Sequence, residues 1–213
     1  MWYRVKRIMT RPWGVEKQVR PSGLPSAYQE VEYIQSSGTQ YFIIWNTFKT
    51  SYKSVIDFQM ITIGSDYVPL WVRNADYNPN YRYWIDAWNS YFKIISWWNN
   101  WESTIREDKN RHSITVDKST ATVDGTNYSI SYVNYTFSDW IWVFYYHSID
   151  WNSWYYASIK LYKLDIYDEN WNHIFDGYPC YRKSDSVIWM YDVVWQQFYT
   201  NQWTWTFTKW PNV

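Results

Sequence analysis

Apolar and polar residues alternate along most of this chain with a period of two, which is typical of strands. The alternation is clearest in Ile159 to Tyr167 (IKLYKLDIY) and on both sides of Asp124-Gly125 in Thr120 to Ile130 (TATVDGTNYSI). An Asp-Gly pair between alternating segments is a strong β-hairpin signal. No segment holds a convincing helical period, so the pattern predicts an all-β protein. The expected strands are Glu30 to Ile34, Gln40 to Ile44, Ser54 to Ile63, Tyr91 to Ile95, Ser113 to Val116, Ala121 to Ser129, Ile141 to Tyr146, Ser158 to Tyr167 and Ile188 to Asp192.

Many short strands at this spacing predict an antiparallel sandwich or jelly roll. We expect that domain to span residues 25–213. Residues 1–24 form a separate stretch with a strand candidate, Tyr3 to Ile8, and a proline-containing linker. This appendage has too little apolar surface to fold alone, so we expect it to pair with the main domain or with a partner chain.

The balance of tryptophan and glycine is unusual, with 19 Trp and only 6 Gly. A domain of this size should carry roughly 15 Gly at the average frequency of about 7%. Several Trp stand beside Asn or Asp, as in Trp98-Asn99 and Asp150-Trp151, where hairpin turns normally place Gly. The run Ser96 to Ser103 (SWWNNWES) is an ordinary flexible loop if its Trp are read as Gly. A bulky residue in a left-handed turn costs about 1–2 kcal/mol.

Two explanations compete for these tryptophans. One is an aromatic binding surface, because Trp and Tyr are favoured in binding hot spots. The other is that many of the codons are UGA, decoded here as Trp, from an organism such as an uncultured bacterium that reads UGA as Gly. We favour recoding, because a binding surface would not place Trp selectively beside Asn and Asp. It predicts that a good share of seven tryptophans lie in exposed turns or loops, and that several have a positive φ or stand next to a residue that does; these are Trp84, Trp98, Trp101, Trp151, Trp171, Trp203 and Trp210.

Charge and hydropathy exclude several classes of function. Twenty basic and twenty acidic residues give no net charge, which argues against nucleic-acid binding. The basic start, MWYRVKRIMTRPW, lacks the apolar core of a secretory signal. The longest apolar run, Trp140 to Tyr146, is far shorter than the roughly 18 residues of a membrane span. With Cys180 as its single cysteine, the chain has no internal disulfide framework, and we expect a soluble protein without an export signal.

Two parts of the chain carry specific motifs. The first is Leu24 to Phe42 (LPSAYQEVEYIQSSGTQYF); the second comprises Tyr178 to Asp192 (YPCYRKSDSVIWMYD), Phe198 to Asn201 (FYTN) and Trp203 to Val213 (WTWTFTKWPNV). Together they are similar to a family of concanavalin A-like (laminin-G-like) jelly-roll domains in phage structural proteins and gut-bacterial surface proteins, over residues 24–213.

The resemblance implies two packed antiparallel sheets, with any ligand held by loops at one edge or on the concave face. It does not imply a defined chemistry, because fold analogy alone is a weak argument for function. This sequence departs from the family pattern mostly where the family has Gly. Those positions are Ser186, Trp189, Trp203, Trp205 and Trp210.

The sequence indicates neither an enzyme nor a metal site. Glycosidases of this fold class need two facing carboxylates, and their E-x-D-x-x-E strand signature is absent. Glu30 and Glu32 belong to the opening motif and are expected to be structural or solvated. Zinc is not expected, because the histidines are scattered and there is one Cys. These histidines are His112, which we expect to be packed or on the surface, His147 and His173.

Weaker candidates for calcium and ligand binding are open to structural interpretations. Calcium could be held by loop aspartates, although turn formation explains them better; these are Asp66, Asp76, Asp86, Asp139 and Asp150. A local ion pair or turn-bracing network is expected for Arg182, Lys183, Asp185 and Asp192, with Tyr181 and Tyr191 in the core or at a sheet edge. The stretches Tyr77 to Tyr83 and Tyr145 to Tyr156 could stack on sugars, although Tyr is also a favoured strand residue.

We therefore expect a non-enzymatic recognition or structural module. The first hypothesis is a phage tail or fibre protein that contacts a host surface glycan or protein, as a homo-oligomer or with other virion proteins. The alternative is a bacterial surface lectin or adhesin of the same fold, which would need an export route. A glycan-cleaving enzyme has the least support. The expected location is the virion or the cell surface, and no ligand-binding residues are identified.

Overall fold

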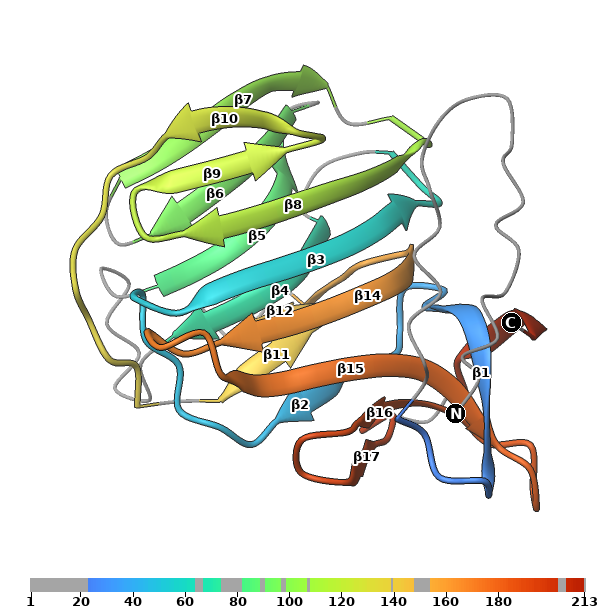
Figure 1. Cartoon of the computed structure of the whole chain (residues 1–213). Helices are drawn as coiled ribbons and strands as arrows, with labels where there is room; N and C mark the ends of the chain where they lie inside the picture. The colour runs from blue at the N-terminus through green and yellow to red at the C-terminus, as the bar shows by residue number, and fades with distance from the viewer. Residues whose placement is uncertain are drawn as a thin grey trace, which may run out of the picture.

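The computed structural model describes residues 23–63, 67–73, 82–88, 91–96, 99–106, 108–138, 140–147, 154–202 and 206–212. These residues form an all-β sandwich of antiparallel sheets, which confirms the predicted fold class (Figure 1). They include no helix long and apolar enough to cross a membrane. The expected N-terminal appendage lies outside the described residues, except for Gly23 and Leu24.

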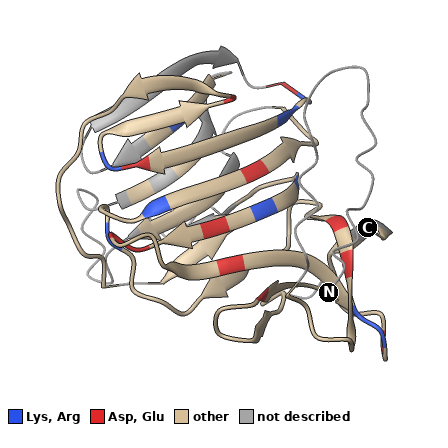
Figure 2. Cartoon of the chain, viewed as in Figure 1, with Lys and Arg blue, Asp and Glu red and all other residues tan. Residues whose placement is uncertain are grey.

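The larger sheet has ten strands and faces the viewer in Figure 1. Its order is β10-β9-β8-β3-β14-β1-β15-β16-β17, with β18 also paired to β1. Charged residues lie along β3, β14 and β15 (Figure 2). The strands are β1 (Tyr28–Gln35), β3 (Lys53–Met60), β8 (Arg111–Asp117), β9 (Thr120–Val123), β10 (Thr126–Ser129), β14 (Ile159–Tyr167), β15 (His173–Arg182), β16 (Ile188–Asp192), β17 (Gln197–Tyr199) and β18 (Thr208–Asn212).

The smaller sheet has six strands in the order β2-β11-β4-β5-β6-β7 and lies behind the larger one. A separate two-stranded ribbon, β12-β13, contacts β4. The strands are β2 (Phe42–Ile44), β4 (Tyr67–Arg73), β5 (Arg82–Trp88), β6 (Tyr91–Ser96), β7 (Asn99–Arg106), β11 (Ile141–Val143), β12 (Tyr145–His147) and β13 (Trp154–Tyr156).

The core fills the space between the two sheets. On β3 every second side chain is buried, and Ile56 and Phe58 point inward to meet residues such as Phe92 of β6. One buried polar contact crosses between the sheets, where the hydroxyls of Ser54 and Tyr83 lie 2.5 Å apart. Burial raises the pKa of Tyr83 and keeps it neutral. A satisfied hydroxyl pair avoids the cost of burying either group alone.

The alternating segments become strands as expected, and the Asp124-Gly125 hairpin is confirmed by the pairing of β9 with β10. Ile141 to Tyr146 was expected as one strand, but the chain breaks at Phe144, which has a φ of 69°. The expectation of a flexible loop from Ser96 to Ser103 is wrong for the described part. Ser96 ends β6, and residues 99–103 belong to β7, which pairs with it.

The tryptophans only partly follow the turn prediction. Trp171 lies in the tight turn between β14 and β15, is 62% exposed and has a φ of 66°. Ser186, where the family pattern has Gly, also has a positive φ of 59°. Three of the seven tryptophans lie in strands instead of turns, and three others fall outside the described residues. The first group is Trp84, Trp101 and Trp210; the second is Trp98, Trp151 and Trp203.

Candidate functional site

Four aromatic side chains gather on the outer face of the smaller sheet, where β12-β13 folds against it. Tyr41 precedes β2, Trp142 lies on β11, Tyr145 on β12 and Tyr156 on β13. The rings of Tyr41 and Tyr145 stack with centroids 4.7 Å apart. The centroid of the Tyr145 ring is 5.2 Å from that of Trp142 and 5.2 Å from that of Tyr156. We call these four residues the aromatic platform.

Strand alternation explains why these rings point outward. Phe42 and Ile44 are buried in the core, so Tyr41 on the same strand path faces the opposite side. Ile141 and Val143 likewise direct Trp142 outward. The left-handed backbone at Phe144 then redirects the chain, and Tyr145 pairs with Tyr156 across the ribbon.

A braced loop presents Tyr41. The side-chain oxygen of Gln40, which is buried, accepts a hydrogen bond from the backbone N–H of Ser37 at 2.8 Å. Its amide group donates to the carbonyl of Thr206 at 3.2 Å. Gly38 has a φ of 96°, which a side chain would disfavour. The SSGTQY motif thus forms a compact loop that ends at the platform.

The C-terminal motif fixes the same residue from the other side. The side-chain oxygen of Asn201, in the FYTN motif, accepts the backbone N–H of Tyr41 at 3.0 Å. The next residue, Gln202, donates its backbone N–H to the carbonyl of Tyr41 at 3.0 Å. The two sequence motifs, about 160 residues apart, therefore converge on Tyr41.

The platform is uncharged and partly accessible. Tyr145 is buried, whereas Tyr41, Trp142 and Tyr156 are half-buried. Burial raises the pKa of Tyr41, and burial together with nearby Tyr41 raises that of Tyr156. Both phenols remain protonated at neutral pH and can donate or accept hydrogen bonds. This arrangement suits stacking against a flat apolar surface with polar groups at its rim.

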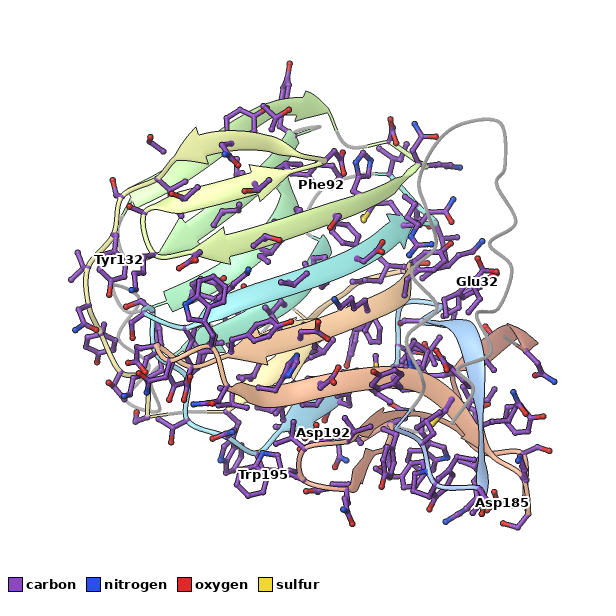
Figure 3. All side chains as sticks on the ribbon, viewed as in Figure 1. Glu32, Phe92, Tyr132, Asp185, Asp192 and Trp195 are labelled. Carbon is purple, nitrogen blue, oxygen red and sulfur yellow. The ribbon has the colours of Figure 1, made fainter. Side chains whose placement is uncertain are left out.

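The most recognisable sequence motif braces a turn, as expected. Arg182 pairs with Asp185 through its Nε, 3.0 Å from each carboxylate oxygen, and this pairing lowers the pKa of Asp185. Asp185 lies at the tip of the β15-β16 turn (Figure 3). Lys183 donates to the carbonyl of Ser26 at 2.8 Å. Nothing in these contacts requires a ligand.

Asp192 braces a different turn, the one that follows β16. Its Oδ1 accepts the backbone N–H groups of Asp176 and Val194, each at 3.0 Å. The residue is completely buried, and burial raises the pKa of its carboxyl group. Figure 3 shows Asp192 beside β15 and β16, near the turn that carries Trp195.

His112 is a packed residue, as predicted. It is 5% exposed and lies against the ring of Phe92, with centroids 4.7 Å apart. Its Nδ1 is 2.7 Å from Asp124 Oδ2, and its Nε2 is 3.0 Å from Asp108 Oδ1. His147 lies in β12, and His173 opens β15.

The remaining candidates separate into described and undescribed residues. Glu30 and Glu32 lie on β1, consistent with a structural or solvated role. Asp86 was expected in a loop but lies within β5, so that expectation is wrong. Tyr83 is 1% exposed and cannot stack on a ligand, and Tyr191 is a core residue. Residues outside the described part include Asp66, Asp76, Asp139, Asp150 and most of Tyr77 to Tyr83.

The sequence singled out only part of the platform. The stretch Tyr145 to Tyr156 was a stacking candidate, and its two end residues do lie in the platform. Tyr41 was not identified, although its place just before an apolar run (FII) in an alternating segment was a usable signal. No family model matches this chain, and no curated protein matches it.

Proposed function

We propose that this β-sandwich is a non-enzymatic recognition module that binds a glycan at the aromatic platform. The observation that carries the proposal is the group of half-buried rings, Tyr41, Trp142 and Tyr156, around buried Tyr145. The flat apolar faces of pyranose rings match aromatic rings of this size. The phenol groups can hydrogen-bond the hydroxyls at the sugar's edge.

Rigidity of the platform favours binding. Tyrosine has few rotatable bonds, so fixing it on a ligand costs little conformational entropy. The Gln40 loop and Asn201 hold the backbone of Tyr41, and Tyr145 stacks beneath its ring. A binding surface that is ordered before the ligand arrives loses less affinity to ordering.

Glycan binding is tested with a glycan array, followed by calorimetry on the best ligand. Tyr41→Ala and Tyr156→Ala should each weaken binding roughly tenfold or more, because each removes a stacking surface. Tyr128→Ala is the matched control, since Tyr128 is also half-buried but lies on β10 of the other sheet. Thermal melts confirm that each variant is folded.

A third variant, Trp142→Gly, separates the tyrosines from the tryptophan whose identity depends on the genetic code. Binding that survives this change places the affinity on the tyrosines. The proposal fails if no glycan binds, or if binding is unchanged in both tyrosine variants.

We further propose that the module is a concanavalin A-like jelly roll in a phage tail or fibre, where it contacts a host surface glycan. The sequence resemblance supports this context. Mass spectrometry of purified particles from an induced lysate should detect the chain. Detection on the bacterial surface but not in particles would instead favour the lectin or adhesin hypothesis.

A further inference from the structure

A second cluster lies on the outer face of the larger sheet, on the opposite side of the sandwich from the aromatic platform. Asp165 of β14 and Asp176 of β15 are directly opposite each other in the antiparallel register. His173 is the first residue of β15 and pairs with Tyr167, just beyond the β-bulge between Ile166 and Tyr167. One ligand atom from each of these three residues lies within 4.8 Å of the others.

The two carboxylates are withdrawn from water. Asp165 is completely buried and Asp176 is 9% exposed. Placing two carboxylates so close together in a low-dielectric site is costly, because like charges repel and both lose hydration. The Lys163 ammonium, 2.6 Å from Asp165 Oδ2, offsets part of this repulsion, and a divalent cation bound by both carboxylates would offset the rest.

The imidazole of His173 supplies an independent observation. Its Nε2 is shielded from solvent and has no hydrogen-bond partner among the described residues, although the residue as a whole is only partly buried. A buried nitrogen left without a partner costs about as much as a lost hydrogen bond. In contrast, both ring nitrogens of His112 have carboxylate partners. Metal coordination is a standard role for such a nitrogen when carboxylate oxygens converge nearby.

The surroundings hold these three groups in place. The ring of Tyr167 lies against that of His173, with centroids 4.2 Å apart. Asp165 Oδ2 is 2.6 Å from the Lys163 ammonium and accepts the Tyr167 hydroxyl at 3.3 Å. Ligating carboxylates are usually hydrogen-bonded in this way by neighbours. A carboxylate has lone pairs for both kinds of contact.

The turn before His173 is also fixed. Asp168 Oδ1 accepts the backbone N–H groups of Asn170 and Asn172, at 2.8 and 2.9 Å. The backbone N–H of Asp168 in turn donates to the carbonyl of Asn172 at 2.9 Å. These hydrogen bonds fix the turn and thereby hold His173 close to the two carboxylates.

We propose that Asp165, His173 and Asp176 form a binding site for a divalent transition-metal ion, with Zn²⁺ as the best-suited probe. Two carboxylate oxygens and one imidazole nitrogen match the donor set of zinc. Calcium prefers six to eight oxygen ligands and is disfavoured by this set. Three protein ligands leave a further position for water or for a group from a bound partner.

The test is calorimetric titration of the chelator-treated full chain with Zn²⁺, Mn²⁺ and Ca²⁺. Zn²⁺ should bind with a stoichiometry of one and more tightly than Ca²⁺. His173→Ala and Asp176→Asn should each weaken Zn²⁺ binding roughly tenfold or more. Asp57→Asn is the matched control: Asp57 lies on the same sheet face but pairs with Arg111, 2.7 Å from its Nε.

A spectroscopic measurement on the wild-type chain keeps the test decisive if a variant does not fold. Co²⁺ added in place of Zn²⁺ should give visible absorption bands of a low-symmetry nitrogen and oxygen site, and Zn²⁺ should displace it. The proposal is overturned if Zn²⁺ does not bind, if Ca²⁺ binds more tightly, or if folded His173→Ala binds Zn²⁺ as well as the wild type.

Discussion

His112 and His173 each stand beside two aspartates, yet the two sites are built differently. His112 points inward from β8, and its two nitrogens face opposite ways, one toward Asp124 and one toward Asp108. His173 lies on the outer face of β15, and one of its ring nitrogens lies within 4.8 Å of a carboxylate oxygen of Asp165 and of one of Asp176. The first arrangement satisfies every ring nitrogen, whereas the second leaves Nε2 without a hydrogen bond.

The difference shows that residue types alone do not define a site. Aspartates on opposite sides of an imidazole complete its hydrogen bonds and tie three segments of chain together. Aspartates close together on neighbouring strands gather negative charge, which Lys163 balances only in part. The first geometry is stabilising by itself, and the second becomes stabilising when an ion is bound.

The largest expected effect is at His112. His112→Ala should lower the free energy of unfolding by about 2–3 kcal/mol, because it removes the contacts to Asp108 and Asp124 and opens a cavity beside Phe92. His173→Ala in chelator should lower it by less than about 1 kcal/mol, since the main loss there is packing against Tyr167. Urea denaturation of both variants measures the contrast. Equal losses of the free energy of unfolding in the two variants would contradict this prediction.

Neutralising one aspartate at each site should act in opposite directions. Asp124→Asn weakens the contact to His112 and should cost about 1–2 kcal/mol. Asp176→Asn in chelator should raise the free energy of unfolding by about 1 kcal/mol, because it removes repulsion from Asp165. Thermal melts at neutral pH, with and without Zn²⁺, distinguish the two. A strong loss in Asp176→Asn would instead indicate that the carboxylate pair stabilises the metal-free fold.

On acidification, Asp108 and Asp192 should change the free energy of unfolding in opposite directions. Although partial burial opposes the shift, hydrogen bonds from Asn110 and His112 hold the pKa of Asp108 below its usual value. Its stabilising contribution is present above about pH 4 and is lost as the pH falls through the lowered pKa. Asp108→Asn should therefore lose less stability than the wild type on acidification.

The sign is reversed for Asp192, whose pKa is raised by burial. The folded state binds this proton more readily than the unfolded state. The wild type should therefore gain stability relative to Asp192→Asn as the pH falls through the raised pKa toward about 4. Melting curves from pH 7 to pH 3 test both variants. Parallel curves for Asp192→Asn and the wild type would contradict the assignment.

The smallest effect is expected at two tryptophans that flank His173. Trp171→Gly relieves a φ of 66° but loses the contact with the Lys53 ammonium, 4.4 Å from the ring, so the net gain should be about 0.5–1 kcal/mol. Trp195 is equally exposed at 62%, and its indole donates to the carbonyl of Ile174 at 3.0 Å. Trp195→Gly should therefore destabilise. If both variants are more stable than the wild type, the removal of an exposed ring explains the gain, and relief of the positive φ at Trp171 does not.

The sequence predicts the fold where alternation is strong, as in Ile159 to Tyr167 and the Asp124 hairpin. The sequence does not predict β5 and β7. Trp84 and Trp101 lie in these strands, although we interpreted them as candidates for turns or loops. Two half-buried tryptophans, Trp142 and Trp189, have an indole N–H that is shielded from solvent and has no hydrogen-bond partner among the described residues. Leaving such a group without a partner costs about 1–3 kcal/mol.

The two candidate sites depend on pairings between distant segments. Tyr41 meets Tyr145 only because β2 pairs with β11, and Asp165 meets Asp176 only through the β14-β15 register. The sequence places the three histidines far apart, which argued against zinc. That argument considered histidines and cysteines, whereas the cluster brings one imidazole close to two carboxylates from neighbouring strands.

The position of β1 in the larger sheet has a consequence for how the chain folds. This first strand pairs with β14, β15 and β18. The pairing of Val31 with Asn212 can therefore form only after β18 has been synthesised. Strands β4 to β7 instead pair with their immediate successors and can form as soon as they are synthesised. The smaller sheet should then appear first, with the apolar side of Ile85 and Ile94 open to solvent until the larger sheet closes over it. During that interval the nascent protein is most exposed to aggregation and most dependent on chaperones.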